Sequence, residues 1–205
     1  MTLGAAEILI LFFVTLGPLK LIGPFAHATS TADAKTVRQI AVRAFVLSTI
    51  CAVAAGFVGR FVLSNWQVTL PALTLTGGII LFLVALRQLL QQYEALHPPL
   101  AESAAAPMAI ALKLTFPVVL TPYGLAAVIA LFAASTGSAR VEVILAMLLI
   151  VMVLNLVAML YAHRILNGPT VLVLQAVGAV LGVLQVALSV QIMIRALREL
   201  GVPLQ

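Results

Sequence analysis

Six long apolar stretches, each of about 20 residues or more, constrain this chain more than any other feature of its sequence. The chain is 63% apolar and 8% charged, whereas a soluble domain carries about 25% charged residues. Lipid admits only helix bundles and closed barrels, because every backbone polar group must be paired, and these runs lack the alternation of barrel strands. We therefore predict an all-α, polytopic membrane helix bundle of six spans, at residues 3–25, 40–63, 71–90, 107–132, 143–166 and 171–196.

The first and fourth spans are interrupted by glycine and proline at matching places. Proline removes a backbone donor and clashes with the preceding turn, so each break frees carbonyl groups at a depth without water. Such breaks persist only where they are buried in protein or line a wet cavity, and paired breaks are the best sequence indication of a transport site. The interruptions are Gly17-Pro18 and Gly23-Pro24 in the first span, and Pro117, Thr121-Pro122 and Gly124 in the fourth.

The two halves of the chain resemble each other. Residues 77–86 are similar to residues 177–184, and Pro18 corresponds in register to Pro122. A three-span unit duplicated in tandem enters the membrane in opposite senses, so we predict two inverted repeats within one transmembrane domain. Chance similarity between helices rich in leucine, valine and glycine is the alternative. The glycines in these stretches predict tight packing of the third and sixth spans. The predicted repeats are residues 1–100 and 105–205.

Basic residues are distributed unequally between the two membrane faces. Six spans place both termini on one side, and the face with more lysine and arginine is expected to be cytoplasmic. Both termini are therefore predicted to be external. The predicted cytoplasmic face carries Lys35, Arg38, Arg43, Arg87 and Arg164, and the other face carries Arg60, Arg140, Arg195 and Arg198.

Lys20 and Lys113 are the charges that the spans must accommodate. A lysine at the bilayer centre costs roughly 2.5–3.5 kcal/mol on insertion scales. Each lies about 8–9 Å from the predicted cytoplasmic interface at helical rise, so one interpretation is that both stems extend to the headgroups. In the other, the lysines attract carboxylates into a vestibule beneath the broken helices, where half-helix N-termini near Leu19 and Tyr123 present free amides.

Other polar side chains in the spans can form hydrogen bonds between helices or contact a ligand, and both roles are left open. The most conspicuous is Asn155, whose sequence neighbours are all apolar. The further ones are Thr15, Thr115, Thr121, Gln175, Gln185 and Gln191. Together with the lysines and the breaks, the candidate substrate-binding residues are Gly17, Pro18, Lys20, Lys113, Pro117, Thr121, Pro122 and Asn155.

The sequence lacks the residues that several functional classes of protein require. His27, His97 and His163 come from separate segments without ligand spacing, so no metal site is predicted. Cys51 is the single cysteine and Asp33 the single aspartate, so neither thiol redox chemistry nor a two-aspartate protease is expected. No nucleotide or cofactor motif is present, and the scattered basic residues are typical of lipid anchors rather than of a nucleic-acid surface.

Five stretches occur in the order found in a known family. Residues 17–25 resemble its Asn-Pro-(Ile/Leu)-Gly-x-x-Pro-x-Phe, and residues 38–44 its Arg-x-Ile-Ala-x-Arg-Ala. Residues 77–86 resemble its Gly-Gly-Ile-Leu-Leu-Phe-Leu-Ile-Ala-Leu, residues 116–124 its Ile-Pro-Leu-Leu-Ala-Gly-Pro-Gly-Ala, and residues 177–193 its closing Met-Gly…Val-Gln-Met. The family that the chain resembles is the MarC-related family of bacterial inner-membrane proteins, also described as neutral amino-acid transporters.

The chain departs from the family pattern at the breaks. Gly17 stands where the family has asparagine, Lys20 where it has glycine, and Lys113 where it has proline. Residues 121–123 replace Gly-Pro-Gly. The loss of the asparagine and the gain of two lysines favour a more anionic substrate. The resemblance implies a bacterial inner membrane, which makes both predicted external termini periplasmic.

These observations predict a secondary transporter that moves a small amino acid or related carboxylate by alternating access, with its site at the broken spans. Neither enzymatic activity nor a cofactor is expected. The alternatives are a non-transporting membrane scaffold or stress protein, and an anion or metal-ion exporter of similar architecture. The predicted partners are a small-molecule substrate and membrane lipid but not nucleic acid, and self-association is left open.

Overall fold

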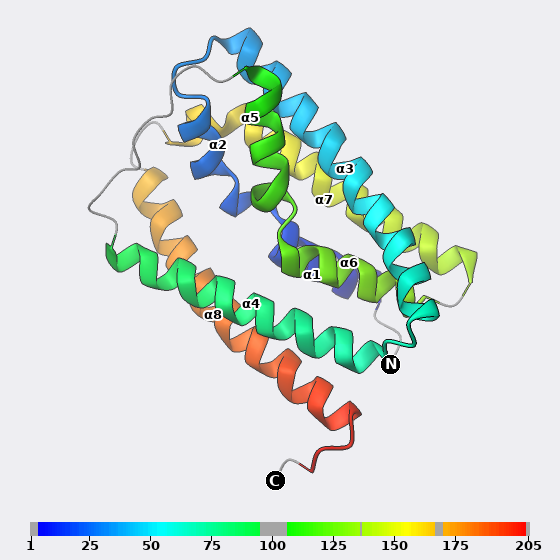
Figure 1. Cartoon of the computed structure of the whole chain (residues 1–205). Helices are drawn as coiled ribbons and strands as arrows, with labels where there is room; N and C mark the ends of the chain where they lie inside the picture. Colours follow the sequence, from blue (N-terminus) through cyan, green and yellow to red (C-terminus); the bar gives the residue numbers. More distant parts are fainter. Residues whose placement is uncertain (1–3, 95–105, 136, 167–169, 204–205) are drawn as a thin grey trace.

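The computed structural model is an all-helical bundle, as predicted. It describes residues 4–94, 106–135, 137–166 and 170–203 (Figure 1). Within these residues, five helical segments are long and apolar enough to cross a membrane, or six if one bent pair is a single span. The helices are α1 (Ala5–Leu16), α2 (Ile22–Ala28), α3 (Ala34–Asn65), α4 (Leu70–Glu94), α5 (Pro107–Lys113), α6 (Pro122–Ala133), α7 (Ser138–Leu166) and α8 (Thr170–Glu199), with the short turns η1 (Pro18–Lys20) and η2 (Leu114–Val119) between broken pairs.

Both predicted breaks are present. The first span consists of α1, η1 and α2, and its chain is extended at Gly17, where ψ is 168°. The fourth consists of α5, η2 and α6, and its two arms are bent by 67°. Within η2 the backbone of Phe116 is non-helical, and Thr121 is extended before α6 begins. Figure 1 shows α1 and α6 on one side of the breaks, with α2 and α5 on the other.

The second span is longer than predicted, because α3 begins at Ala34 and not at residue 40. Asp33 is the N-cap residue with an extended backbone, and such residues favour helix initiation. A hydrogen bond with the Thr36 side chain lowers the pKa of the Asp33 carboxyl. Lys35, Arg38 and the other basic residues that follow are good helix formers, so the basic segment continues the helix instead of forming a loop.

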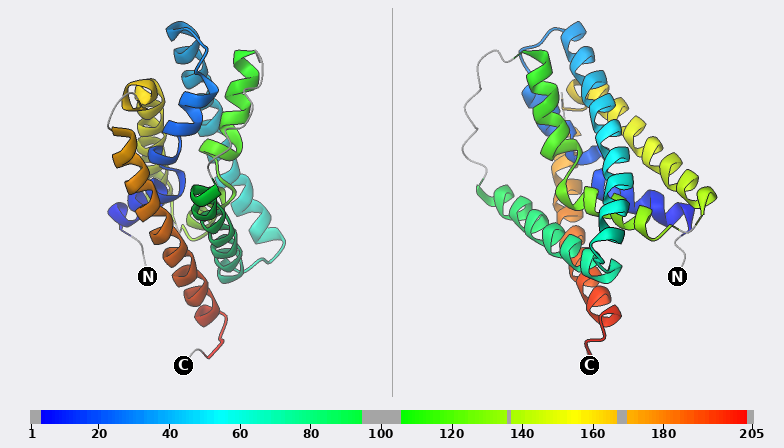
Figure 2. Two further views of the ribbon diagram at one scale, coloured as in Figure 1. Left: turned by 90° about the vertical axis from the view of Figure 1, so that its left-hand side faces the viewer. Right: turned by 45° about the vertical axis from the view of Figure 1, so that its right-hand side comes forward.

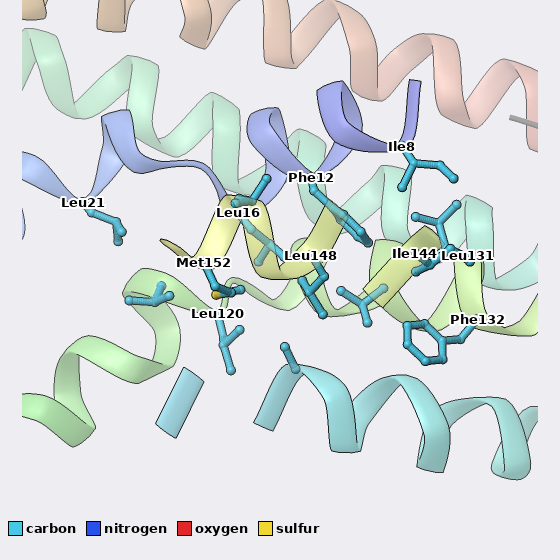
Figure 3. Packing of buried hydrophobic residues seen from close by; sticks show 14 residues of the cluster. Ile8, Phe12, Leu16, Leu21, Leu120, Leu131, Phe132, Ile144, Leu148 and Met152 are labelled. Carbon is cyan, nitrogen blue, oxygen red and sulfur yellow. The ribbon is translucent and has the colours of Figure 1, made fainter. Parts of the chain in front are cut away.

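Two clusters of buried apolar side chains lie on either side of the breaks. The first cluster joins α1 and α6 to α3 and α7 through residues such as Phe12, Phe132 and Leu148 (Figure 3). The second joins α2 and α5 to the other ends of α3 and α7 through residues such as Phe25 and Met159. The long helices α3 and α7 thus connect two packed regions, and the broken spans pass from one region to the other.

The predicted tight packing of the third and sixth spans is confirmed. Helix α4 lies along α8 (Figure 2) and also contacts α6. A Cβ on Gly78 would lie 2.8 Å from Met193 Cγ of α8, and one on Gly77 would lie 3.3 Å from Ala126 Cβ of α6. These glycines therefore let α4 approach both neighbours, as expected where lipid supplies no hydrophobic drive between helices.

The helix ends gather on two opposite sides of the molecule. The start of α1 and the end of α8 lie on the same side (Figures 1 and 2), as an even number of spans requires. Large apolar residues of α3 such as Ile50 and Phe61 are exposed, as is Cys51, and a lipid-facing surface has this character. Both halves contain a broken helix, a long helix and a further helix in that order; their inverted-repeat relationship stays a prediction.

Candidate functional site

Helix α1 ends in three carbonyl groups that its own backbone leaves unpaired. In a continuous helix the carbonyls of Val14, Thr15 and Leu16 would accept from residues 18, 19 and 20. Pro18 has no N–H group, and the extended Gly17 turns the chain away before the other two bonds form. An unpaired carbonyl in a membrane interior costs several kcal/mol, on the order of a lost hydrogen bond in hydrocarbon. These three groups therefore need donors from elsewhere.

Side chains from three other places in the fold supply those donors. Gln185 Nε2 of α8 donates to the Val14 carbonyl at 3.2 Å. Asn155 Nδ2 of α7 donates to the Leu16 carbonyl at 2.8 Å. The Thr15 carbonyl accepts from Thr121 Oγ1 at 3.1 Å and also from Lys20 Nζ. The end of α1 is thus tied to α6, α7 and α8 through hydrogen bonds to its own backbone.

The two breaks meet directly at Thr121. This residue is the N-cap of α6, and its hydroxyl accepts from the Gly124 amide at 3.2 Å while donating to the Thr15 carbonyl. A Cβ on Gly124 would overlap the Leu16 side chain, so the start of α6 is packed closely against the end of α1. Free amides are expected at this half-helix from the sequence, but the Gly124 amide already donates to Thr121 Oγ1.

Lys20 reaches back from η1 to the same junction. Its ammonium group contacts the Thr15 carbonyl, Thr121 Oγ1 at 3.5 Å and Tyr123 Oη at 3.3 Å, and it lies 5.1 Å from the centre of the Tyr123 ring. Among the described residues, no acidic side chain forms an ion pair with it. The cation is half-buried, and the partners that the described residues give it are neutral oxygens and an aromatic face, so that no negative charge balances it there.

A cavity of about 90 Å³ lies beside the first break. Its walls come from α1, η1 and the facing surface of α8, and they are mainly apolar. The polar side chains among them are Lys20 and Gln185, while Gly178 and Gly182 leave part of the α8 wall without side chains. The volume exceeds the roughly 10–15 Å³ that one water needs, and it is below the about 300–1,000 Å³ of pockets for drug-sized ligands. The full lining is Phe13, Val14, Gly17, Leu19, Lys20, Gly178, Leu181, Gly182 and Gln185.

The structure brings some of the predicted site residues together and leaves others apart from the cavity wall. Gly17 and Lys20 line the cavity. Thr121 and Asn155 are buried and bonded to the end of α1. Pro18 starts η1 and Pro122 starts α6, where each fixes the first residue of a half-helix. The remaining two lie on the other arm of the fourth span: Lys113 ends α5, Pro117 is within η2, and both are exposed.

Seven of the residues that line the cavity are not among the predicted site residues, and three of these seven, Gly178, Gly182 and Gln185, share one face of α8. Gly178 and Gly182 are interpreted from the sequence as packing residues only, and Gln185 as one of several polar groups. Gly182 follows Gly178 by four residues and Gln185 follows Gly182 by three, so the three residues lie on one face of α8. A polar amide aligned with two glycines on one helix face is a signal that could have identified this wall of the cavity. Tyr123, expected from the sequence only as the start of a half-helix, also accepts a hydrogen bond from Lys20 through its hydroxyl.

Two further polar groups complete the description of the bundle interior. Asn155 is 1% exposed, and its Oδ1 has no hydrogen-bond partner. His163 Nε2 lies 2.9 Å from Thr29 Oγ1, joining the end of α7 to the end of α2. His97, the remaining residue considered with His27 for a metal site, lies outside the described residues.

Comparison with known proteins gives one family and no individual relative. The sequence pattern of the MarC family integral membrane proteins matches residues 5–200. No curated protein and no solved structure matches the chain. Because the family match covers almost the whole chain, this protein belongs to the MarC family of integral membrane proteins, and the resemblance seen in the sequence is confirmed.

Proposed function

We propose that this member of the MarC family is a secondary transporter that moves a small amino acid or related carboxylate across the membrane by alternating access. The cargo is held beside the broken first span, between η1 and α8. Its carboxylate is recruited by Lys20, and Lys113 on the exposed α5 arm extends the basic path to the junction. In this proposal the membrane is a bacterial inner membrane, the termini are periplasmic, and the protein catalyses no chemical reaction.

The single observation that carries the proposal is an ammonium group that has no counter-ion among the described residues and that lies on the wall of a small cavity beside the first break. Lys20 has three neutral oxygen neighbours and no acidic partner among the described residues. A cation in a membrane span is expensive and is kept mostly for function. A carboxylate entering the cavity would replace a neutral acceptor of Lys20 by an oppositely charged one, so that the hydrogen bond is also an ion pair.

The breaks supply the movement that transport requires. Helix α7 packs against both α1 and α2, whereas α3 packs against both α5 and α6. In the proposed movement, the first broken span moves with α7 and the fourth with α3. The two bodies meet along the contact between α3 and α7 and at the junction of Thr15, Thr121 and Lys20. The junction is held by side-chain hydrogen bonds, which can exchange partners as the bodies rock. No nucleotide-binding motif is present in the sequence, so the driving force is an ion gradient or the gradient of the cargo itself.

A proteoliposome flux assay tests this function. Purified protein is reconstituted, and uptake of labelled small amino acids and short carboxylates is followed with and without an ion gradient. We expect Lys20→Gln to lower the flux roughly tenfold to a hundredfold, since a hydrogen bond to a charged group is worth about 1.5–3 kcal/mol. Lys35→Gln, at the exposed start of α3, is the matched control and should keep the wild-type rate. Absence of flux for every compound contradicts the proposal.

One observation favours the scaffold alternative. All three carbonyls freed at the first break already have protein donors, and a purely structural junction would have the same property. Labelling with an aqueous thiol reagent separates the two functions. In a Cys51→Ser background, single cysteines at Pro18, Lys20, Lys113 and Pro122 should react and be protected by cargo in a transporter. In a dry scaffold, the cysteines at positions 18 and 20 should stay unmodified.

A further inference from the structure

We infer that the cavity selects a short monocarboxylate with an uncharged tail over a zwitterionic amino acid, and that Gly178 limits the length of the tail. This inference rests on the proposed transport function and narrows its cargo to one of the two classes. Three features of the cavity lead to it: the charge of its walls, the hydrogen bonds already made at its edge, and the shape of its α8 wall.

The charge of the walls matches a single negative group. Among the lining residues that the structure describes, Lys20 is the one ionisable residue, and none is an aspartate, glutamate or histidine. A bound monocarboxylate would form a neutral pair with Lys20. A zwitterion would bring a second cation into the same small space without a counter-ion, and burying an unpaired charge is costly.

The carbonyl groups at the cavity edge each already accept a hydrogen bond from a side chain. A broken helix usually offers its freed carbonyls to a bound cation or ammonium group. Here the carbonyls of Val14, Thr15 and Leu16 already accept from Gln185, Thr121 and Asn155, respectively. The ammonium group of an amino acid would have to share these carbonyls with donors that they already have, whereas a carboxylate would replace one of the neutral oxygens that Lys20 now contacts.

The α8 wall determines how long the tail can be. Gly178 has nothing within 4 Å of the position that a Cβ would occupy, so an added methyl group meets open space. Gly182, one turn further along, also lines the cavity. With Phe13, Leu19 and Leu181 as apolar neighbours, the space beside Gly178 suits a tail of a few carbon atoms. A methyl group at position 178 would take up part of that space without disturbing the helix packing.

Equilibrium binding in detergent micelles tests the inference with three ligands of nearly equal size. Propionate carries only the carboxylate, L-alanine adds an ammonium group, and propionamide removes the charge. Binding of labelled propionate is measured, and the other two compete. We expect propionate to bind at least about tenfold more tightly than either competitor, because a mismatched polar group costs more than about 1.4 kcal/mol. Lys20→Gln should abolish the binding and Lys20→Arg should retain part of it.

The size limit is tested with acetate and butyrate in two alanine variants. Gly178→Ala should weaken the binding of butyrate by about tenfold or more, which is the effect of one methyl group in an apolar pocket. The affinity for acetate should stay unchanged. Gly23→Ala is the matched control: Gly23 is also helical and has nothing within 4 Å of its Cβ position, but it does not line the cavity. It should change neither affinity. Equal losses of acetate and butyrate affinity in Gly178→Ala would overturn the size assignment.

The outcomes separate this inference from the proposed function. Lys20-dependent binding and flux of alanine, with propionate unable to compete, overturns the monocarboxylate assignment and leaves the transporter proposal standing. Absence of binding and flux for all compounds overturns both. Propionate binding that needs Lys20, together with weak competition by alanine, supports both.

Discussion

Asn155 and Ser48 are both buried polar residues, but Asn155 hydrogen-bonds to a backbone carbonyl and the Ser48 hydroxyl has no partner. The Asn155 amide donates to the Leu16 carbonyl at 2.8 Å, so it satisfies a group that the broken helix cannot pair. The Ser48 hydroxyl is fully buried in α3 and has no partner. Removing a donor from a buried carbonyl leaves that carbonyl desolvated, whereas removing an unpaired hydroxyl leaves nothing unsatisfied.

Asn155→Ala should therefore lower the free energy of unfolding by about 1–3 kcal/mol, the desolvation cost of the orphaned Leu16 carbonyl. Ser48→Ala should change it by less than about 0.5 kcal/mol or raise it slightly. Both variants are measured by reversible denaturant titration in mixed micelles. An equal loss in the two variants would show that the Asn155–Leu16 bond has no special role at the break.

At the scale of helices, Gly124 permits the contact between the two broken spans. A Cβ at this position would overlap the Leu16 side chain and would lie 2.8 Å from Thr121 Oγ1. Gly124→Ala should push α6 away from α1 and weaken the cap that Thr121 provides. We expect a loss of about 1–3 kcal/mol in unfolding free energy, the usual cost of overpacking. Gly23→Ala, which adds a methyl group in open space, should not show this loss in the same titration.

The sequence predicted the breaks but not the groups that pair with them, and helix chemistry explains why. Proline at positions 18, 117 and 122 acts on its own turn, so the breaks can be located without tertiary structure. The donors Gln185 and Asn155 come from helices far along the chain, and an apolar span does not reveal which face its one polar residue presents. For the same reason Lys20 and Lys113 have similar places in the sequence, although only Lys20 lies on the cavity wall.

In the proposed movement, two bodies meet at the breaks and along the contact between α3 and α7. Helices α1 and α2 pack on α7, and α5 and α6 pack on α3. Each body contributes to both apolar clusters, one on either side of the breaks. If the bodies rock against each other, one cluster opens while the other stays closed, which is the movement that alternating access needs. The bond between Thr121 and Thr15 crosses from one body to the other, whereas that between His163 and Thr29 lies within one.

Cross-linking at these two places provides a direct test of the movement. In a Cys51→Ser background, Leu16→Cys with Gly124→Cys places thiols on facing bodies, and Thr29→Cys with His163→Cys places them on one body. Joining the first pair with a short bifunctional thiol reagent that contains a reducible link should stop flux, because α1 and α6 can no longer separate. Reductant should restore it. The second cross-link should leave flux unchanged, since α2 and α7 move together. If flux continued at the wild-type rate after the first pair was cross-linked, the cargo would have to take a route that does not open this junction, which would contradict the proposed movement.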